Sequence, residues 1–189
     1  MEYFDICDEQ GRPTGATVAR ATAHAEGIRH RTAHIWVLRE QAGRAQVLLQ
    51  KRSAEKDSFP GQYDTPAAGH IQAGDEPLES ALRELGEELG IRATAKDLTF
   101  VGNFAMHYDT EFYGKPFRDR EFVFVYAYAG QVDADSLTLQ AEEVERVDWF
   151  DLEEVCAAVR RHDPCFCVDP EGLEVLRRWL RERGRWAEP

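Results

Sequence analysis

Three glutamates beside one arginine form the densest cluster of chemically useful residues in this chain. Glu84, Glu87 and Glu88 are three and four residues apart, so on a helix they share one flank. Like charges at this spacing repel each other and destabilise a helix. Carboxylate oxygens are ligands that Mg²⁺ and Mn²⁺ prefer, and Mg²⁺ commonly bridges carboxylates to substrate phosphates. The cluster therefore predicts a divalent-metal site, and the alternative is a solvated acidic helix face.

A helix preceded by a glycine loop would position these carboxylates. Apolar residues recur at helical spacing away from the glutamates, at Leu78, Ala81, Leu82, Leu85 and Leu89. Pro77 suits the first turn of the helix, and Gly90 suits a left-handed cap at its end. Gly69 and Gly74 bracket the loop before it and allow tight bending. The pattern predicts a strand, a glycine loop and a helix that packs by one side and presents acids on another.

The stretch from 69 to 91 resembles the Nudix box, in which glycine, glutamate and a final Arg-Glu-Leu-Gly-Glu-Glu-type motif keep a fixed spacing. The matching residues here are Gly69, Arg83, Glu84, Leu85, Glu87, Glu88, Gly90 and Ile91, with Asp75 in place of the first glutamate. The resemblance implies a Nudix-type α/β/α sandwich with a mixed sheet. It also implies a catalytic centre in which Mg²⁺ or Mn²⁺ is held by Glu84, Glu87, Glu88 and a backbone carbonyl of Ala68 or Gly69. By the same resemblance, Arg83 orients the glutamates through a salt bridge.

Length and composition predict one enzyme domain. A chain of 189 residues with 43% hydrophobic content can bury a full core, and we expect one Nudix domain over residues 1–189. The formal net charge of −12 argues against binding nucleic acid or an anionic membrane. The sequence has neither a membrane-spanning apolar run nor a signal peptide, so we expect a cytoplasmic protein and consider a homodimer. Four cysteines without a C-x-x-C pair indicate no zinc site.

Periodicity predicts a mixture of strands and helices, which is typical of a layered α/β domain. Expected strands are 3–6, 34–38, 46–50, 98–107, 121–129 and 144–150, with 34–38 and 46–50 forming a hairpin. Expected helices besides the box helix are 152–161 and 171–183, and we expect this C-terminal region to pack on the same domain. Expected loops are 53–62 and 108–120, and the second contains Gly114 and Pro116.

A weaker similarity, from about residue 5 to 154, points to isopentenyl-diphosphate isomerases and their hydrolase-like relatives. The isomerases carry a catalytic cysteine where this chain has Ala68, which can neither donate nor accept a proton. They also build a metal site outside the box, and the counterparts here are His24, His30, His70, Asp119 and Glu121. The alternative is that the histidines are ordinary core or surface residues. Because the thiol is absent and the box glutamates are complete, we interpret the protein as a hydrolase. The alternatives are an isomerase-like enzyme and a non-catalytic ligand sensor.

The expected substrate is a small-molecule diphosphate, either a nucleoside diphosphate linked to a further group or a related organic diphosphate. Arg52 and Lys56 would bind its phosphates, although both could belong to a solvated loop. His70 and Tyr63 are further candidates for substrate contact. The proton acceptor stays open among Glu84, Glu121, Glu142 and Glu143, and the last three are also candidate metal ligands. Aromatic residues could stack a base, cover an isoprenoid or belong to the core: Tyr63, Tyr108, Phe112, Tyr113 and Phe117.

Overall fold

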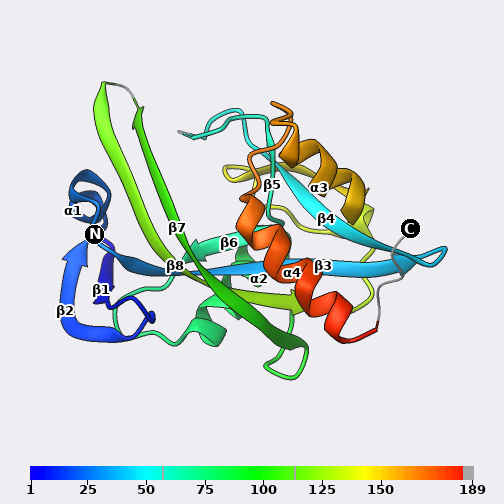
Figure 1. Cartoon of the computed structure of the whole chain (residues 1–189), viewed down its shortest axis with the longest axis horizontal. Coiled ribbons are helices and arrows are strands. Elements are labelled where there is room, and N and C mark those ends of the chain that lie inside the picture. Colours follow the sequence, from blue (N-terminus) through cyan, green and yellow to red (C-terminus); the bar gives the residue numbers. More distant parts are fainter. Residues whose placement is uncertain (57, 113, 185–189) are drawn as a thin grey trace.

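One mixed sheet organises the chain (Figure 1). The computed structural model describes residues 1–56, 58–112 and 114–184. Within these residues, β5, β4, β3, β8 and β7 lie side by side in that order, while β6 pairs with β3 and β9 with β4. The strands are β3 (His30–Gln41), β4 (Arg44–Arg52), β5 (Tyr63–Asp64), β6 (Ala67–His70), β7 (Leu98–Phe112), β8 (Lys115–Tyr128) and β9 (Val144–Asp151). β3 and β8 are parallel, and the other strand pairs are antiparallel.

Helices cover both faces of this sheet, because successive residues of a strand point to opposite sides. Ile35 and Val37 of β3 pack in one core with α2 (Pro77–Leu89). Trp36 of the same strand packs in a second core with α3 (Leu152–Arg160) and α4 (Pro170–Glu182), which Figure 1 shows in front of the sheet. The predicted α/β/α sandwich is therefore confirmed. The ends of α3 and α4 each lie within one residue of the ends expected from the sequence.

The predicted hairpin of 34–38 and 46–50 is also confirmed, as the centre of the longer β3–β4 pair. Its turn falls at Ala42 and Gly43, which both have positive φ, 52° and 76°. Two consecutive positive φ values are the requirement of a tight hairpin turn that matches the twist of its strands. None of the described helices is long and apolar enough to cross a lipid bilayer.

The predicted loop over 108–120 is wrong, because β7 and β8 continue through it as one long hairpin. Paired positions extend to Phe112 opposite Lys115, and Asp109 Oδ1 lies 2.6 Å from the guanidinium of Arg120 across the pair. β8 pairs with β3 only from Glu121 onward, so Pro116 sits where one side of the strand has no sheet partner. A proline there removes no hydrogen bond from the ladder on that side. Figure 1 shows this hairpin projecting beyond the rest of the sheet.

A small N-terminal unit stands at one end of the sheet and includes two elements that the sequence did not predict. β1 (Tyr3–Cys7) pairs with β2 (Pro13–Ala19), and α1 (Arg20–Glu26) follows directly. β2 contains Pro13 and Gly15 and has one buried apolar side chain, Val18, and α1 has only seven residues, so neither gives a periodic signal. α1 packs against β8 and brings its residues to the end of β6 and β3.

Candidate active site

β6 and α2 bring the three glutamates of the box to one place. The backbone N–H of Ala68 donates a hydrogen bond of 3.2 Å to Glu88 Oε2. The next residue, Gly69, lies so close to α2 that a Cβ atom there would fall 2.0 Å from Glu84 Oε1. Only a residue without a side chain allows this approach. β6 and the glutamate-bearing helix α2 are thus in direct contact at two consecutive residues, Ala68 and Gly69.

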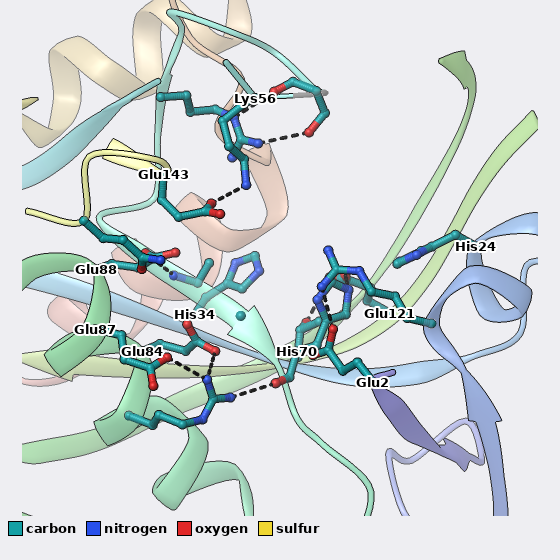
Figure 2. Close-up of a pocket in the computed structure, with 18 of the residues that line it drawn as sticks. Glu2, His24, His34, Lys56, His70, Glu84, Glu87, Glu88, Glu121 and Glu143 are labelled. Atoms are coloured by element: carbon teal, nitrogen blue, oxygen red, sulfur yellow. Dashed lines mark hydrogen bonds and ion pairs between the residues drawn. The ribbon is translucent and has the colours of Figure 1, made fainter. Parts of the chain in front are cut away.

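Arg83 holds two of the glutamates and ties the helix to β6. Its guanidinium Nη1 lies 2.7 Å from Glu84 Oε1 and 3.0 Å from Glu87 Oε2. Its Nη2 donates to the carbonyl oxygen of His70 at 3.2 Å. The geometry matches the orienting role that the family resemblance implied for this arginine. Figure 2 shows the arrangement from the pocket side.

The glutamate cluster has the electrostatics of a cation site. Glu84 and Glu88 are buried, whereas Glu87 is exposed at the helix surface. Burial raises the pKa of Glu84, and burial together with the neighbouring Glu84 charge raises the pKa of Glu88 well above its usual range. Buried carboxylates that lack a full set of compensating partners are costly. An all-oxygen donor set of this kind fits Mg²⁺ or Mn²⁺.

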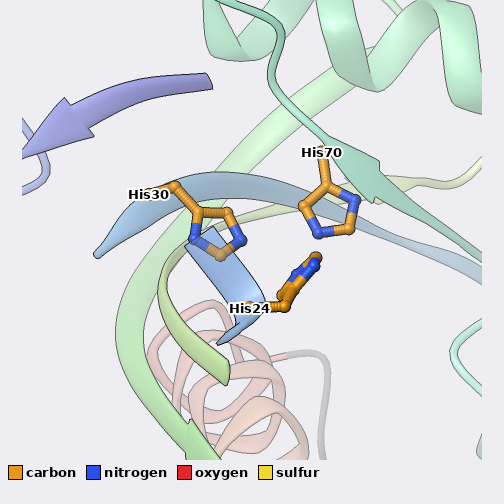
Figure 3. A group of neighbouring side chains, drawn as sticks. All are labelled: His24, His30 and His70. Carbon is orange, nitrogen blue, oxygen red and sulfur yellow. The ribbon is translucent and has the colours of Figure 1, made fainter. Parts of the chain in front are cut away.

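A second cluster of potential ligands lies at the other end of β6 (Figure 3). His24 of α1, His30 of β3 and His70 of β6 place ring nitrogens within 4.8 Å of one another. His24 Nε2 and His30 Nε2 each lie 3.7 Å from Asp119 Oδ1. His70 Nε2 lies 3.5 Å from Glu121 Oε1. The structure therefore brings together all five residues that the isomerase resemblance indicated, although they come from four different elements.

Four potential ligand atoms of this second cluster make no hydrogen bond within the described part of the chain. Among the described residues, the Nε2 atoms of His24, His30 and His70 and the Oδ1 atom of Asp119 are buried without a hydrogen bond. Burial lowers the pKa of His24 to about 4 and that of His70 well below its usual value, so both rings are neutral near pH 7. Neutral imidazoles with free lone pairs are metal ligands.

Supporting hydrogen bonds orient two members of the cluster. His30 Nδ1 lies 2.9 Å from the carbonyl oxygen of Ile28, which leaves its Nε2 facing the cluster. Glu121 Oε2 accepts a hydrogen bond of 2.9 Å from the Thr32 hydroxyl. Partners of this kind commonly fix metal ligands. The donor set of nitrogen and oxygen fits Mn²⁺ or another first-row transition metal better than Mg²⁺.

A cavity of about 360 Å³ lies between the two clusters and contains most of the predicted site residues (Figure 2). Its lining includes six carboxylates, Glu2, Glu84, Glu87, Glu88, Glu121 and Glu143. It also includes four cationic side chains, Arg20, Arg52, Lys56 and Arg83, together with His24, His34 and His70. Arg52 is held by Asp64 at 2.9 Å, and Lys56 forms an ion pair with Glu143. The predicted cationic loop therefore lies at the cavity, with its charges already paired.

Five predicted residues within the described part of the chain do not line the cavity: Tyr63, Tyr108, Glu142 and two members of the histidine cluster, His30 and Asp119. The Tyr63 hydroxyl donates to Asp148 Oδ2 at 2.6 Å and accepts from Arg146 at 2.7 Å, and its ring packs with the α3–α4 core. The Tyr63 side chain therefore lies against the α3–α4 core and outside the cavity lining. Tyr108 and Glu142 are also outside the lining. The residue at 113 and the side chain at 112 lie outside the described part of the structure, and only Phe117 of the five aromatic candidates lines the cavity.

Arg20 and His34 are among the residues that line the cavity and that the sequence did not indicate. Arg20 is the first residue of α1, and its Nη1 pairs with Glu2 Oε2 at 2.8 Å. It lies four residues before His24, so helical spacing would have placed both on one face had α1 been expected. His34 lies opposite Ala68 in the β3–β6 pair, and burial lowers its pKa.

Comparisons with known proteins show which family the sequence matches. Residues 28–166 match the family model described as the NUDIX domain. Nudix hydrolase 3 of Arabidopsis thaliana is 37% identical over 169 residues, which are 87% of this chain, while the chain spans only 21% of that plant protein. An uncharacterized Nudix hydrolase of Clostridium acetobutylicum is 36% identical over 154 residues, 82% of this chain and 72% of the relative. The crystal structure of DR0079 from Deinococcus radiodurans superposes with a TM-score of 0.69 at 18% identity, covering 94% and 98% of the two chains. That last likeness shows the fold.

Proposed function

The chain belongs to the Nudix family and is a hydrolase, and from this premise we propose that it cleaves a diphosphate linkage in a divalent-metal-dependent reaction. The proposed substrate is a nucleoside diphosphate linked to a further group, or a related small organic diphosphate. The observation that carries the proposal is the contact of β6 with α2. There Glu88 receives the Ala68 N–H at 3.2 Å and Glu84 lies against Gly69.

Nudix hydrolases generally use divalent metal ions, and we assign Mg²⁺ or Mn²⁺ to the glutamate cluster. Glu84, Glu87 and Glu88 would hold it, together with the backbone carbonyl of Ala68, and the raised pKa values of Glu84 and Glu88 support this assignment. When bound, the cation would neutralise phosphate charge and orient the scissile group. His24, His30, His70, Asp119 and Glu121 form the proposed second site, supported by their unpartnered donor atoms.

The chain's own side chains have separate tasks in this proposal. Arg83 positions Glu84 and Glu87, as its distances of 2.7 Å and 3.0 Å allow. Arg52 and Lys56 exchange their present acidic partners for substrate phosphates, for which an arginine fork is well suited.

A carboxylate must accept the proton of the attacking water. The positions of the four candidate carboxylates relative to the cavity exclude one of them. Of the four candidates, Glu84, Glu121 and Glu143 line the cavity, while Glu142 does not. Glu143 forms an ion pair with Lys56, and the Glu121 side chain is buried beside the histidines at the edge of the cavity. The acceptor therefore belongs to the set of Glu84, Glu121 and Glu143.

An isomerase-like activity is the second candidate, because one specific observation favours it. The histidines and acids that the resemblance to isopentenyl-diphosphate isomerases indicated lie close together in the structure. The residue at the position of the isomerase cysteine is Ala68, whose methyl group cannot transfer a proton to or from a carbon atom. We therefore propose that the chain shares the architecture of that branch and performs hydrolysis. A ligand sensor would not need the complete set of box glutamates.

We further propose that residues 1–189 act as one Nudix domain. Support comes from the core that α3 and α4 share with β3, β4 and β8, and from the contribution of the N-terminal unit to the cavity. The last residues, 185–189, lie outside the described part of the chain.

A substrate panel tests the proposed function. The purified protein is incubated with nucleoside diphosphate sugars, dinucleoside polyphosphates, nucleoside diphosphates and isopentenyl diphosphate, with Mg²⁺ or Mn²⁺, and the cleaved products are resolved by chromatography. We expect cleavage of at least one class, abolished by excess EDTA and restored by added metal. Failure to cleave any compound with a folded protein, or full activity in EDTA, contradicts the proposal.

A further inference from the structure

One imidazole in the cavity has no task in the proposed hydrolysis. His34 of β3 lines the cavity, and among the described residues it belongs to neither group of side chains that could hold a metal ion. Its ring makes no hydrogen bond or ion pair within the described part of the chain. The cationic side chains of the lining, in contrast, all have acidic partners: Arg20 with Glu2, Arg52 with Asp64, Lys56 with Glu143, and Arg83 with Glu84 and Glu87. His34 is therefore a polar group of the cavity that is available to a ligand.

The register of β3 and β6 places His34 at the glutamate end of the cavity. His34 pairs with Ala68, and the next pair on the same face, Thr32 with His70, lies towards the histidine cluster. The Ala68 N–H points away from β3, because it donates to Glu88 at 3.2 Å. Ala68 and His34 therefore form a pair without hydrogen bonds between them, in which the Cα atoms are about 4.5 Å apart and the side chains approach most closely. The His34 ring thus lies beside the residue whose backbone contacts Glu88.

Apolar neighbours support the His34 ring from the core side. The ring lies edge-on to Phe104, with centroids 6.0 Å apart and an interplanar angle of 78°. Phe104 is buried in the core that α3 and α4 share with the sheet, and so is Val125, the neighbour of His34 on β8. On the β6 side, Ala68 presents only a methyl group. Figure 2 shows the ring beside β6, between Glu143 on one side and Glu84 on the other.

His34 is a neutral hydrogen-bonding group. Burial lowers its pKa, and the carboxylates of Asp64 and Asp169 oppose this shift only in part. A neutral imidazole has one N–H donor and one acceptor nitrogen. Its N–H can donate to a phosphate oxygen, and a hydrogen bond to a charged acceptor is stronger than one between neutral groups. Because the ring carries no charge, it does not repel a cation at the neighbouring glutamates.

From this arrangement we propose that His34 is a substrate-binding residue, whose imidazole N–H donates a hydrogen bond to an oxygen of the phosphoryl group held at the glutamate cluster. The inference rests on the proposed hydrolysis and adds a residue to it. His34 transfers no proton in this role, and the proton of the attacking water still passes to a carboxylate. His34 also makes no bond to the metal ion.

Equilibrium binding tests the contact without turnover. Titration calorimetry follows imidodiphosphate, a diphosphate analogue with a nitrogen bridge, in the presence of MgCl₂ or MnCl₂. We expect His34→Leu to weaken its binding by about tenfold or more, because leucine fills a similar space and donates no hydrogen bond. His34→Gln keeps an N–H donor and should bind within about threefold of the wild type. Equal affinities of His34→Leu and the wild type, or no binding to the wild type, overturn the inference.

The affinity for the metal alone separates this role from that of a metal ligand. Calorimetry with MnCl₂ and no phosphate compound should give His34→Leu an affinity within about twofold of the wild type. A tenfold loss would assign His34 to the metal site and overturn the inference. Circular dichroism checks that each variant is folded. If His34→Leu does not fold, His34→Val takes its place, because a β-branched residue suits a central strand.

A histidine outside the cavity provides the matched control. His107 of β7 is exposed and does not line the cavity, so His107→Leu should bind imidodiphosphate and Mn²⁺ like the wild type. An equal weakening in His107→Leu and His34→Leu would contradict a contact specific to His34.

Kinetics on a substrate from the panel distinguishes hydrogen bonding from proton transfer. We expect kcat/KM to fall by about tenfold or more in His34→Leu and to stay within about threefold in His34→Gln, since glutamine donates a hydrogen bond but cannot accept a proton at neutral pH. An equal loss in both variants overturns the inference and leaves the hydrolase function intact. If the panel yields no substrate, the proposed function fails, whereas the calorimetry still decides whether His34 binds the phosphate group.

Discussion

At the scale of single residues, the buried glutamates are arranged for binding rather than for stability. An ionised carboxylate that is buried without a partner costs several kcal/mol, and a nearby like charge adds to this cost. Glu88 has one backbone N–H donor from Ala68 and lies near Glu84, whose counter-charge among the described residues is Arg83. The metal-free protein therefore carries an unfavourable site that a cation would relieve.

The pKa shift of Glu88 gives a prediction for the stability of the metal-free protein. Its pKa is raised in the folded state, so its protonated form stabilises the fold below about pH 4.5, and this contribution is lost as pH rises through the folded pKa. Glu88→Gln cannot ionise and keeps an acceptor for the Ala68 N–H. In EDTA at pH 8 we expect the variant to melt a few degrees above the wild type, with the difference shrinking towards pH 5. Thermal unfolding followed by circular dichroism measures this, with the exposed Glu87→Gln as control. A lower Tm for Glu88→Gln at pH 8 would show that the carboxylate is compensated without metal.

Substitution of the box glutamates should lower activity, whereas Glu88→Gln should raise the melting temperature of the metal-free protein. Glu87→Gln or Glu88→Gln should lower kcat by about 10²-fold or more, because metal-ion stabilisation of phosphate charge supplies several kcal/mol. Glu142→Gln is the matched control, since Glu142 lies outside the cavity lining and should leave kcat unchanged. Steady-state kinetics on a cleaved substrate measures all three. Unchanged kcat in both box variants would remove these residues from the centre.

At the scale of elements, the function depends on how closely β6 approaches α2. A Cβ atom at Gly69 would meet the flexible end of Glu84 at 2.0 Å, so Gly69→Ala should fold and displace that carboxylate. We expect kcat to fall at least tenfold with a small change in Tm. Gly86→Ala is the control, because its Cβ would meet nothing closer than 3.8 Å and alanine favours the helix by up to about 1 kcal/mol. It should keep activity and raise Tm. If Gly69→Ala is fully active, the close approach does not matter to catalysis.

We expect the C-terminal helix α4 to serve the fold rather than the chemistry. Leu173, Leu176 and Leu180 are buried in the shared core, whereas the exposed Arg178 and Arg181 lie outside the cavity lining. Leu176→Ala should lower stability by about 2–5 kcal/mol. The double variant of Arg178 and Arg181 to alanine should leave kcat/KM within about threefold, well under the 1.4 kcal/mol of a tenfold change. A tenfold loss in a folded double variant would mean that α4 contacts substrate.

At the scale of the whole molecule, the cavity is lined by residues inside the range that the family model matches and by residues outside it. The model matches residues 28–166, but Glu2, Arg20 and His24 also line the cavity. These residues come from the N-terminal unit, which packs against β8 and closes the histidine cluster. We therefore regard this unit as part of the active centre.

The sequence predicts the features formed by residues that are close together along the chain, and it fails for features that depend on distant residues. The box helix and α4 were predictable because local periodicity and caps define them. The hairpin of β7 and β8 was not, because Gly114 and Pro116 are ordinary loop signals, and only the pairing of distant positions extends the strands past them. The position of Tyr63 depends on which side of a two-residue strand it faces, which no periodic pattern records. The histidine cluster joins residues as far apart as 24 and 121, so only the resemblance to a known family pointed to it.

Isotope transfer from water tests the central claim most directly. The wild-type protein cleaves its best diphosphate substrate in ¹⁸O-labelled water with Mg²⁺ or Mn²⁺, and mass spectrometry reads the phosphate products. Isopentenyl diphosphate is incubated in parallel and examined for dimethylallyl diphosphate. We predict one ¹⁸O atom in a phosphate product for each bond cleaved, and no isomerised product. Unlabelled phosphate products, or isomerisation at a rate comparable with hydrolysis, would contradict the assignment of this protein as a hydrolase whose nucleophile is water.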